Sequence, residues 1–183
     1  MTDTHPVSDL LRSGAAQGQW TLDPANSTVK FRVKHFWHAI TVSGLFEQIE
    51  GAGTVAPDGS VSGQLTMQAG SVSTSNSRRD KHLRSADFFD AEQHPLVVLT
   101  VTGADPASND EIAVRGTLQA AGRSQPVSFT ARAEDTGPDA VTLRAEVVVD
   151  RTVFGMTWSP LGIAAKEAAG SVVARFTRSP TGS

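Results

Sequence analysis

The feature that most constrains the fold is a series of short segments in which apolar and polar residues alternate. In residues 29–34, Val29, Phe31 and Val33 alternate with basic residues, which is the period of a strand with one buried face. Further strands are predicted at residues 42–46, 96–102, 111–118, 127–133, 141–149 and 171–178. Because turn signals such as Asp58-Gly59 separate these segments, the sequence predicts an antiparallel barrel or sandwich.

One helical segment interrupts the strands, near residues 76–85. Asn76 or Ser77 can cap its first turn. Asp80 suits the positive end of the helix dipole, and Arg84 suits the negative end. A helix of about ten residues is marginal alone, so we expect it to lie against one end of the sheet as a lid or plug.

Length and composition narrow the possible functions. The 183 residues, 39% of them apolar, suit one domain with a sizeable core. The net charge of −3 argues against a nucleic-acid partner. The absence of cysteine removes disulfides and thiolate chemistry. No apolar run approaches the roughly 20 residues of a transmembrane segment.

The first 18 residues show no signal-peptide pattern. We expect residues 1–18 to be a disordered tail and residues 19–179 to form the single domain. The same observation predicts a cytoplasmic protein.

No side chains stand out as catalytic or metal-binding. The chain has no Gly-x-Ser-x-Gly elbow, and its five histidines are scattered rather than spaced as metal ligands. We therefore expect no catalytic residue, no metal and no cofactor.

The basic residues of the helical segment leave three interpretations open. Arg79 and Asp80 form a catalytic or phosphate-binding pair, or Asp80 caps the helix within a solvated basic patch, or Arg79 and His82 meet an anionic head group at the mouth of a barrel.

A barrel of about eight strands leaves room inside for side chains or one slender ligand. Small inward residues such as Gly63, Ala131 and Ala145 favour a cavity. The residues predicted by inward parity to line it are Phe31, Val33, Phe46, Leu65, Leu99, Val114, Phe129 and Leu143.

Residues 96–101 and 147–149 are apolar on both faces, which a partner subunit would explain, so a homodimer is a further expectation.

Several motifs also resemble a known family. They are Val29-x-Phe31-x-Val33-x-His35, Arg79-Asp80-x-His82-Leu83-Arg84-Ser85-x-Asp87-Phe88-Phe89-Asp90 and Arg151-x-x-Phe154-Gly155-Met156. Over roughly residues 20–178, the chain resembles the YceI-like family of polyisoprenoid-binding, lipocalin-like proteins. Many members carry a secretory signal peptide, and this chain has a polar extension instead.

The resemblance implies an all-β fold: an antiparallel, lipocalin-like β-barrel of about eight strands around an apolar tunnel, with the short helix at one end. It implies a long-chain isoprenoid, an isoprenoid quinone or a fatty-acid derivative as ligand. The first hypothesis is therefore a protein that carries or sequesters such a lipid, with transient membrane contact and no enzyme activity. The alternatives are an enzyme acting on a lipid-like substrate in the same cavity and a ligand-free scaffold with a filled barrel.

Overall fold

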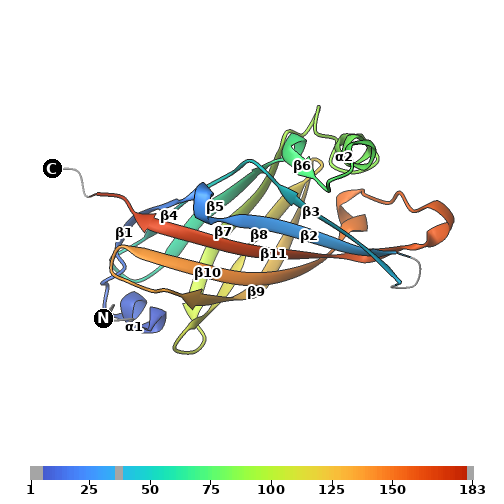
Figure 1. The fold of residues 1–183 in the computed structure, drawn as a ribbon. Coiled ribbons are helices and arrows are strands. Elements are labelled where there is room, and N and C mark those ends of the chain that lie inside the picture. Colours follow the sequence, from blue (N-terminus) through green and yellow to red (C-terminus); the bar gives the residue numbers. More distant parts are fainter. Residues whose placement is uncertain (1–5, 36–38, 181–183) are drawn as a thin grey trace.

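The molecule is a barrel of antiparallel strands with one helix at each end (Figure 1). The computed structural model describes residues 6–35 and 39–180. The helices are α1 (Val7–Arg12) and α2 (Ser77–Arg84). The strands are β1 (Gly18–Leu22), β2 (Thr28–His35), β3 (Ile40–Phe46), β4 (Ile49–Val55), β5 (Val61–Gln68), β6 (Val72–Ser73), β7 (Leu96–Pro106), β8 (Glu111–Ala120), β9 (Arg123–Glu134), β10 (Ala140–Asp150) and β11 (Ala164–Arg178).

Eight of these strands close the barrel. Their order is β1-β4-β5-β7-β8-β9-β10-β11, and β11 pairs with β1 to complete the ring. Strand β11 is long enough to pair with β1 at its carboxyl end and with β2 over residues 164–173. Strands β3 and β6 continue the sheet beyond β2. The predicted all-β barrel of about eight strands is therefore confirmed.

Local sequence explains the strand connections. The hairpin between β4 and β5 turns at Asp58-Gly59, where Gly59 has φ +82° and the Asp58 carboxylate accepts a hydrogen bond from the Ser60 amide at 2.9 Å. In β3, position 44 requires a glycine for packing rather than for a turn. A Cβ atom there would lie 2.6 Å from the Phe31 ring, and the pairing with β2 runs through it without a register shift. Gly44 thus makes room for an aromatic ring.

The buried side chains form two clusters along the barrel axis. One, around Phe46, Met67 and Phe154, lies towards α2, and the other, around Leu11, Val55 and Ile112, lies towards α1. Helices α1 and α2 lie at opposite ends of the barrel (Figure 1), so each end has its own apolar cluster.

The described part of the amino-terminal segment differs from the predicted disordered tail. Residues 7–12 form α1, and its Val7 and Leu11 are buried against the barrel. The segment that follows is held by Arg178, whose guanidinium donates hydrogen bonds to the carbonyls of Ala15 and Gln17. The reason is the apolar spacing at positions 7, 10 and 11, which gives a short helix one face to bury. Residues 1–5 lie outside the described residues.

Within residues 6–35 and 39–180, no helix combines the length and the apolar character needed to cross a membrane.

Candidate ligand-binding cavity

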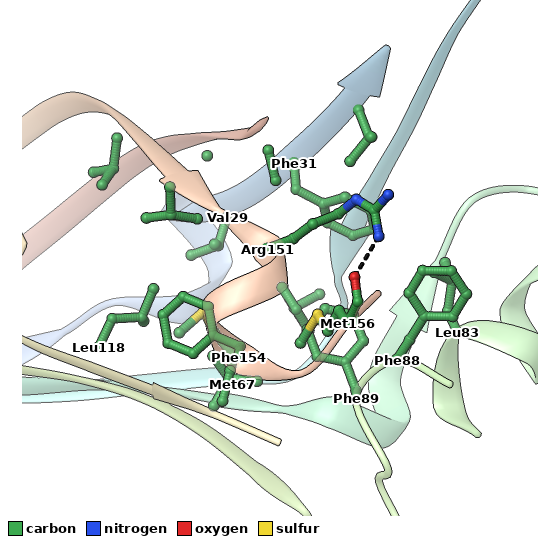
Figure 2. Close-up of a pocket in the computed structure, with 18 of the residues that line it drawn as sticks. Val29, Phe31, Met67, Leu83, Phe88, Phe89, Leu118, Arg151, Phe154 and Met156 are labelled. Atoms are coloured by element: carbon green, nitrogen blue, oxygen red, sulfur yellow. Dashed lines mark hydrogen bonds between the residues drawn. The ribbon is translucent and has the colours of Figure 1, made fainter. Parts of the chain in front are cut away.

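The barrel interior contains two adjoining apolar chambers. The upper chamber, towards α2, has a volume of about 250 Å³ (Figure 2). The lower chamber, towards α1, has a volume of about 200 Å³. Leu65, Leu99, Phe129 and Val172 line both, so the two chambers meet at these side chains. The interior is hollow rather than filled.

The structure places every predicted lining residue in the wall of this cavity. Phe31, Val33 and Phe46 line the upper chamber. Val114 and Leu143 line the lower chamber, and Leu65, Leu99 and Phe129 line both. The expected inward parity thus agrees with the structure in each strand. That these side chains bind a ligand stays a prediction.

An aromatic cluster packs below α2 in the upper chamber. The ring centroids of Phe31 and Phe46 are 5.8 Å apart, and Phe89 meets them at 6.3 and 5.4 Å with its ring tilted edge-on. Phe89 comes from the segment after α2, so the cluster joins that segment to β2 and β3. Edge-to-face arrangements at this spacing are favourable.

Helix α2 begins where the sequence predicts. The Asn76 side chain accepts a hydrogen bond from the Arg79 amide at 3.0 Å, which satisfies one free N–H of the first turn. Asp80, however, is buried and accepts hydrogen bonds from the amide and hydroxyl of Thr74, at 2.8 and 2.5 Å. Its role is to fasten α2 to the residue after β6 rather than to cap the helix.

Arg79 also contacts Thr74, so the interpretation as a wholly solvated basic patch is wrong. Its Nε donates to the Thr74 hydroxyl at 2.8 Å and its Nη2 donates to the Thr74 carbonyl at 3.0 Å. The side chain lines the upper chamber. Arg84 makes a similar link, donating from Nη2 to the Val72 carbonyl at 2.9 Å. Both cations hold α2 across the end of the barrel.

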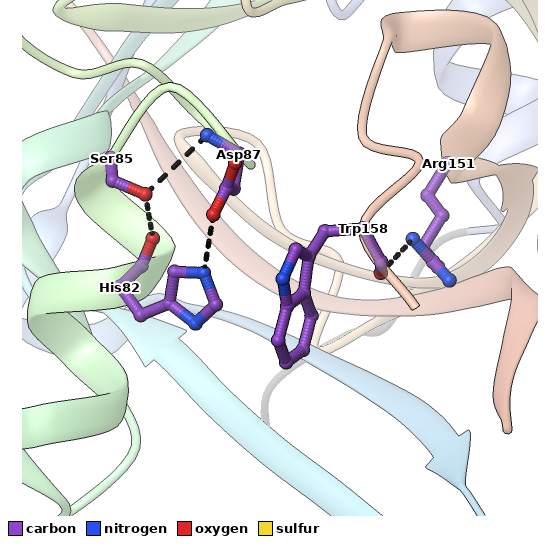
Figure 3. Close-up of polar contacts among 5 residues, drawn as sticks. All are labelled: His82, Ser85, Asp87, Arg151 and Trp158. Atoms are coloured by element: carbon purple, nitrogen blue, oxygen red, sulfur yellow. Dashed lines mark hydrogen bonds and ion pairs between the residues drawn. The ribbon is translucent and has the colours of Figure 1, made fainter. Parts of the chain in front are cut away.

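His82, the second predicted head-group residue, lies beside the loop of residues 155–163, which we call the mouth loop. The His82 ring centroid is 4.4 Å from that of Trp158, edge-on, and its Nε2 is 2.7 Å from the Asp87 carboxylate (Figure 3). Both His82 and Trp158 line the upper chamber. Helix α2 and the mouth loop therefore form one rim, and Trp158 lies at the opening.

Arg151 is a site residue that sequence reasoning missed. It is only 5% exposed, at the end of β10, and lines the upper chamber. Its Nε donates to the Ala165 carbonyl at 2.8 Å, its Nη1 to the carbonyls of Met156 and Trp158, and its Nη2 to the Ala164 carbonyl (Figures 2 and 3). The guanidinium thus shapes the mouth loop. The sequence signal that could have identified Arg151 as a site residue is its position in the Arg151-x-x-Phe154-Gly155-Met156 motif.

Two groups of the upper chamber have shifted pKa values, and the second shift includes the effect of nearby positive charges. Burial lowers the pKa of the Arg151 guanidinium, against a smaller opposing effect of the Asp150 carboxylate. Burial also lowers the pKa of His35, and the positive charges of Arg151 and Arg79 lower it further. A guanidinium stays protonated in proteins, so the chamber holds two permanent cations beside an imidazole whose neutral form is favoured.

The lower chamber is closed by α1. Val7, Leu10 and Leu11 line it from the end of the barrel, together with Trp20. The Trp20 indole donates a hydrogen bond to the Ala16 carbonyl at 2.9 Å, and the Arg178 guanidinium lies 5.1 Å from its ring centroid. Among the residues that the structure describes, no group of three or more His, Asp or Glu side chains is arranged to hold a metal ion.

Comparison with known proteins shows where this architecture belongs. A family model described as the YceI-like domain matches residues 20–175. The chain belongs to the YceI-like family. A UPF0312 protein of Pectobacterium carotovorum subsp. carotovorum is 29% identical over 171 residues, 88% of each chain. Protein YceI of Escherichia coli O157:H7 is 31% identical over 113 residues, which is 61% of this chain and 58% of that protein.

Solved structures share the fold of this YceI-like protein. BcnA of Burkholderia cenocepacia superposes with a TM-score of 0.76 at 19% identity, covering 84% of this chain and 98% of that one. A polyisoprenoid binding domain of Saccharophagus degradans superposes with a TM-score of 0.71 at 14% identity, covering 87% and 98%. At such identities the likeness concerns the fold alone.

Proposed function

We propose that this YceI-like protein binds one long-tailed apolar ligand in its barrel and carries or sequesters it. The ligand classes are a polyisoprenoid, an isoprenoid quinone or a fatty-acid derivative. The observation that carries the proposal is the apolar cavity that continues from α2 to α1 through a wall shared by both chambers. The description of the Saccharophagus degradans neighbour as a polyisoprenoid binding domain supports the same ligand class.

The energetics of the cavity suit such a ligand. Removing hydrocarbon from water stabilises a complex by about 0.8 kcal/mol per methylene, so a tail binds without specific polar contacts. The charged or basic groups lie at the upper chamber, and the lower chamber is lined by no charged side chain within the described residues. The tail would therefore occupy the lower chamber and the head would stay near the mouth.

Titration of the delipidated protein with a polyprenol, a quinone and a fatty amide tests this proposal. We expect saturable binding of one molecule per chain, measured by calorimetry. Because selectivity comes from the width and length of the cavity, ligands of similar girth should compete with one another. Failure of all three classes to bind would contradict the proposal.

We propose a binding role rather than a catalytic one. An enzyme acting in the same cavity would depend on an ionisable group within reach of the substrate, and His82, which lines the upper chamber, is the group to test. We expect His82→Ala to retain ligand binding. Any turnover of the bound lipid by the native protein that is lost in His82→Ala would instead favour the enzyme.

The exposed side chains of the mouth loop support a transient contact with a membrane as part of this proposal. Leu161 is 97% exposed at φ +57° between Pro160 and Gly162, and Trp158 beside it is 41% exposed. Apolar and tryptophan side chains of this kind enter the membrane interface, and the exposed Arg78 and Lys81 of α2 lie on the same rim. We expect Leu161→Glu to weaken sedimentation with vesicles that contain anionic lipid, and Val148→Glu, on the outer face of β10, to have no such effect.

The predicted homodimer and cytoplasmic location stay predictions. Val148 of β10 is 62% exposed, and Leu96 of β7 is also exposed, so apolar side chains do lie on the outside of the barrel where a partner subunit would cover them. Light scattering of the purified protein distinguishes a monomer from a dimer.

A further inference from the structure

The ionisable side chains that line the upper chamber all carry basic groups. They are Lys30, His35, Arg79, His82 and Arg151, and no Asp or Glu is among the described residues of that wall. Two of the five side chains already have solvent or an acidic partner beside them. The Lys30 side chain is exposed, and His82 is paired with Asp87. In the described part of the chamber wall, Arg79, Arg151 and His35 remain without an acidic partner.

Arg151 is the most unusual of these groups because its charge is buried and, among the described residues, forms no ion pair. Its four hydrogen bonds all go to backbone carbonyls. A guanidinium has five N–H donors, so one N–H of Nη2 has no acceptor among the described residues. The neighbouring Asp150 carboxylate accepts from the amide and hydroxyl of Thr152 at 2.8 and 2.5 Å. Within the described chain, no carboxylate lies within 4 Å of the Arg151 guanidinium.

Arg79 offers a second set of free donors. Its Nε and one N–H of Nη2 bond to Thr74, which leaves both N–H groups of Nη1 and one of Nη2 without acceptors in the described part of the structure. Thr74 and Asn76 hold the backbone and the side chain of Arg79 in place, so these donors are oriented in advance. Arg79 is only partly buried, so these donors are accessible to a ligand that enters the chamber. The cost of a buried charge that is not paired falls on Arg151.

His35 reports on the field that these two cations create. Beyond the effect of burial, Arg151 and Arg79 both lower its pKa, which means that both act on the same region of the upper chamber. A site that disfavours a further positive charge favours a negative one by the same electrostatic interaction.

From this arrangement, which rests on the proposed function, we infer that the ligand carries an oxyanion head group, a carboxylate or a phosphate monoester, that pairs with Arg151 and Arg79. Guanidinium groups match both oxyanions in geometry and charge, and such hydrogen bonds are shorter and stronger than neutral ones. The tail then runs from the head group past Phe129 into the lower chamber. A neutral head group leaves the two cations uncompensated.

Four probes with the same tail and different head groups test this inference: hexadecanoate, hexadecyl phosphate, hexadecanol and hexadecanamide. Each is titrated into the delipidated full chain below its aggregation limit. At least one oxyanion probe should bind ten-fold or more tighter than the alcohol and the amide, about 1.4 kcal/mol. The preferred oxyanion distinguishes a carboxylate from a phosphate ligand. Equal affinity across the four probes overturns the inference and leaves the proposed function standing. Failure of all four to bind contradicts the proposed function itself.

Variants then locate the effect. Arg79→Gln removes one cation, Arg151→Gln removes the other, and Arg78→Gln is the matched control, because Arg78 is exposed on the same helix and lies outside the cavity wall. We expect Arg79→Gln to reduce the preference for the oxyanion while hexadecanol affinity is kept, and Arg78→Gln to leave the preference unchanged. Arg151→Gln loosens the mouth loop as well, so its melting curve is measured first, and Arg79→Gln decides the question if that variant does not fold. A preference that survives in Arg79→Gln and in a folded Arg151→Gln overturns the assignment to this site.

Discussion

Filling the lower chamber should shorten the ligand that the barrel accepts, and Ala145→Phe is the substitution that does so. Ala145 of β10 pairs with Ala131 of β9, is buried, and lines the lower chamber. Cavity-lining residues of β10 run from Val149 to Val141. Those eight residue steps span about 27 Å along the strand and about 20 Å along the axis of a barrel with tilted strands. A phenyl ring halfway along would exclude the tail from about the last 10 Å.

The expected loss follows from the methylenes that stay outside. Excluding even four methylenes from the barrel makes the free energy of binding less favourable by about 3 kcal/mol, which raises Kd roughly a hundredfold. Calorimetry with two ligands that share a head group but differ in tail length measures this. Ala145→Phe should weaken the long-tailed ligand by that factor and leave the short-tailed ligand unchanged. Val148→Phe is the control, because Val148 lies on the outer face of the same strand. A folded Ala145→Phe protein that binds the long tail at native affinity would refute the reasoning that the tail reaches the lower chamber.

Three further predictions concern stability and closure. Asp80→Ala leaves the buried Thr74 amide without its acceptor and should lower the free energy of unfolding by about 1–3 kcal/mol in urea, whereas the exposed Glu92→Ala should change it little. Because burial and the nearby cations lower the pKa of His35 in the folded state, the unfolded chain binds more protons below its own histidine pKa, near 6.5. Stability should therefore fall as the pH drops from about 6.5 towards 5, and His35→Gln should flatten this fall in thermal melts. An unchanged slope in His35→Gln would argue against a lowered pKa of His35 in the folded state. Leu11→Asp should release α1 and raise hydrogen exchange in residues 7–17 while the barrel strands stay protected; Arg12→Asp, exposed on the same helix, should not.

The inward face of each strand could be predicted because side chains alternate with period two. Val114 and Leu143 were assigned to the interior from that alternation alone, and both line the lower chamber. The cap of α2 could be predicted for a similar reason, since Asn76 needs only the amide of Arg79 three residues on. Local geometry fixes these features, and local geometry is visible in the sequence.

Contacts between distant segments could not be predicted in this way. The acceptors of Arg151 are carbonyls of residues 156–165, and no side-chain pattern marks a carbonyl as an acceptor. Helix α1 has the spacing of an amphipathic helix at Val7, Leu10 and Leu11, but six residues are too few to be stable without the barrel end that covers them. A glycine inside a strand often marks a bulge, but Gly44 leaves space for the ring of Phe31 on the neighbouring strand, and that contact is not visible in the sequence.

Native mass spectrometry of the protein freshly purified from its own host, followed by organic extraction, tests the central claim most directly. We expect one long-tailed lipid per chain, released with an intact tail on extraction. A protein that carries no lipid when isolated, and that also takes up no quinone, polyprenol or fatty amide afterwards, would contradict it.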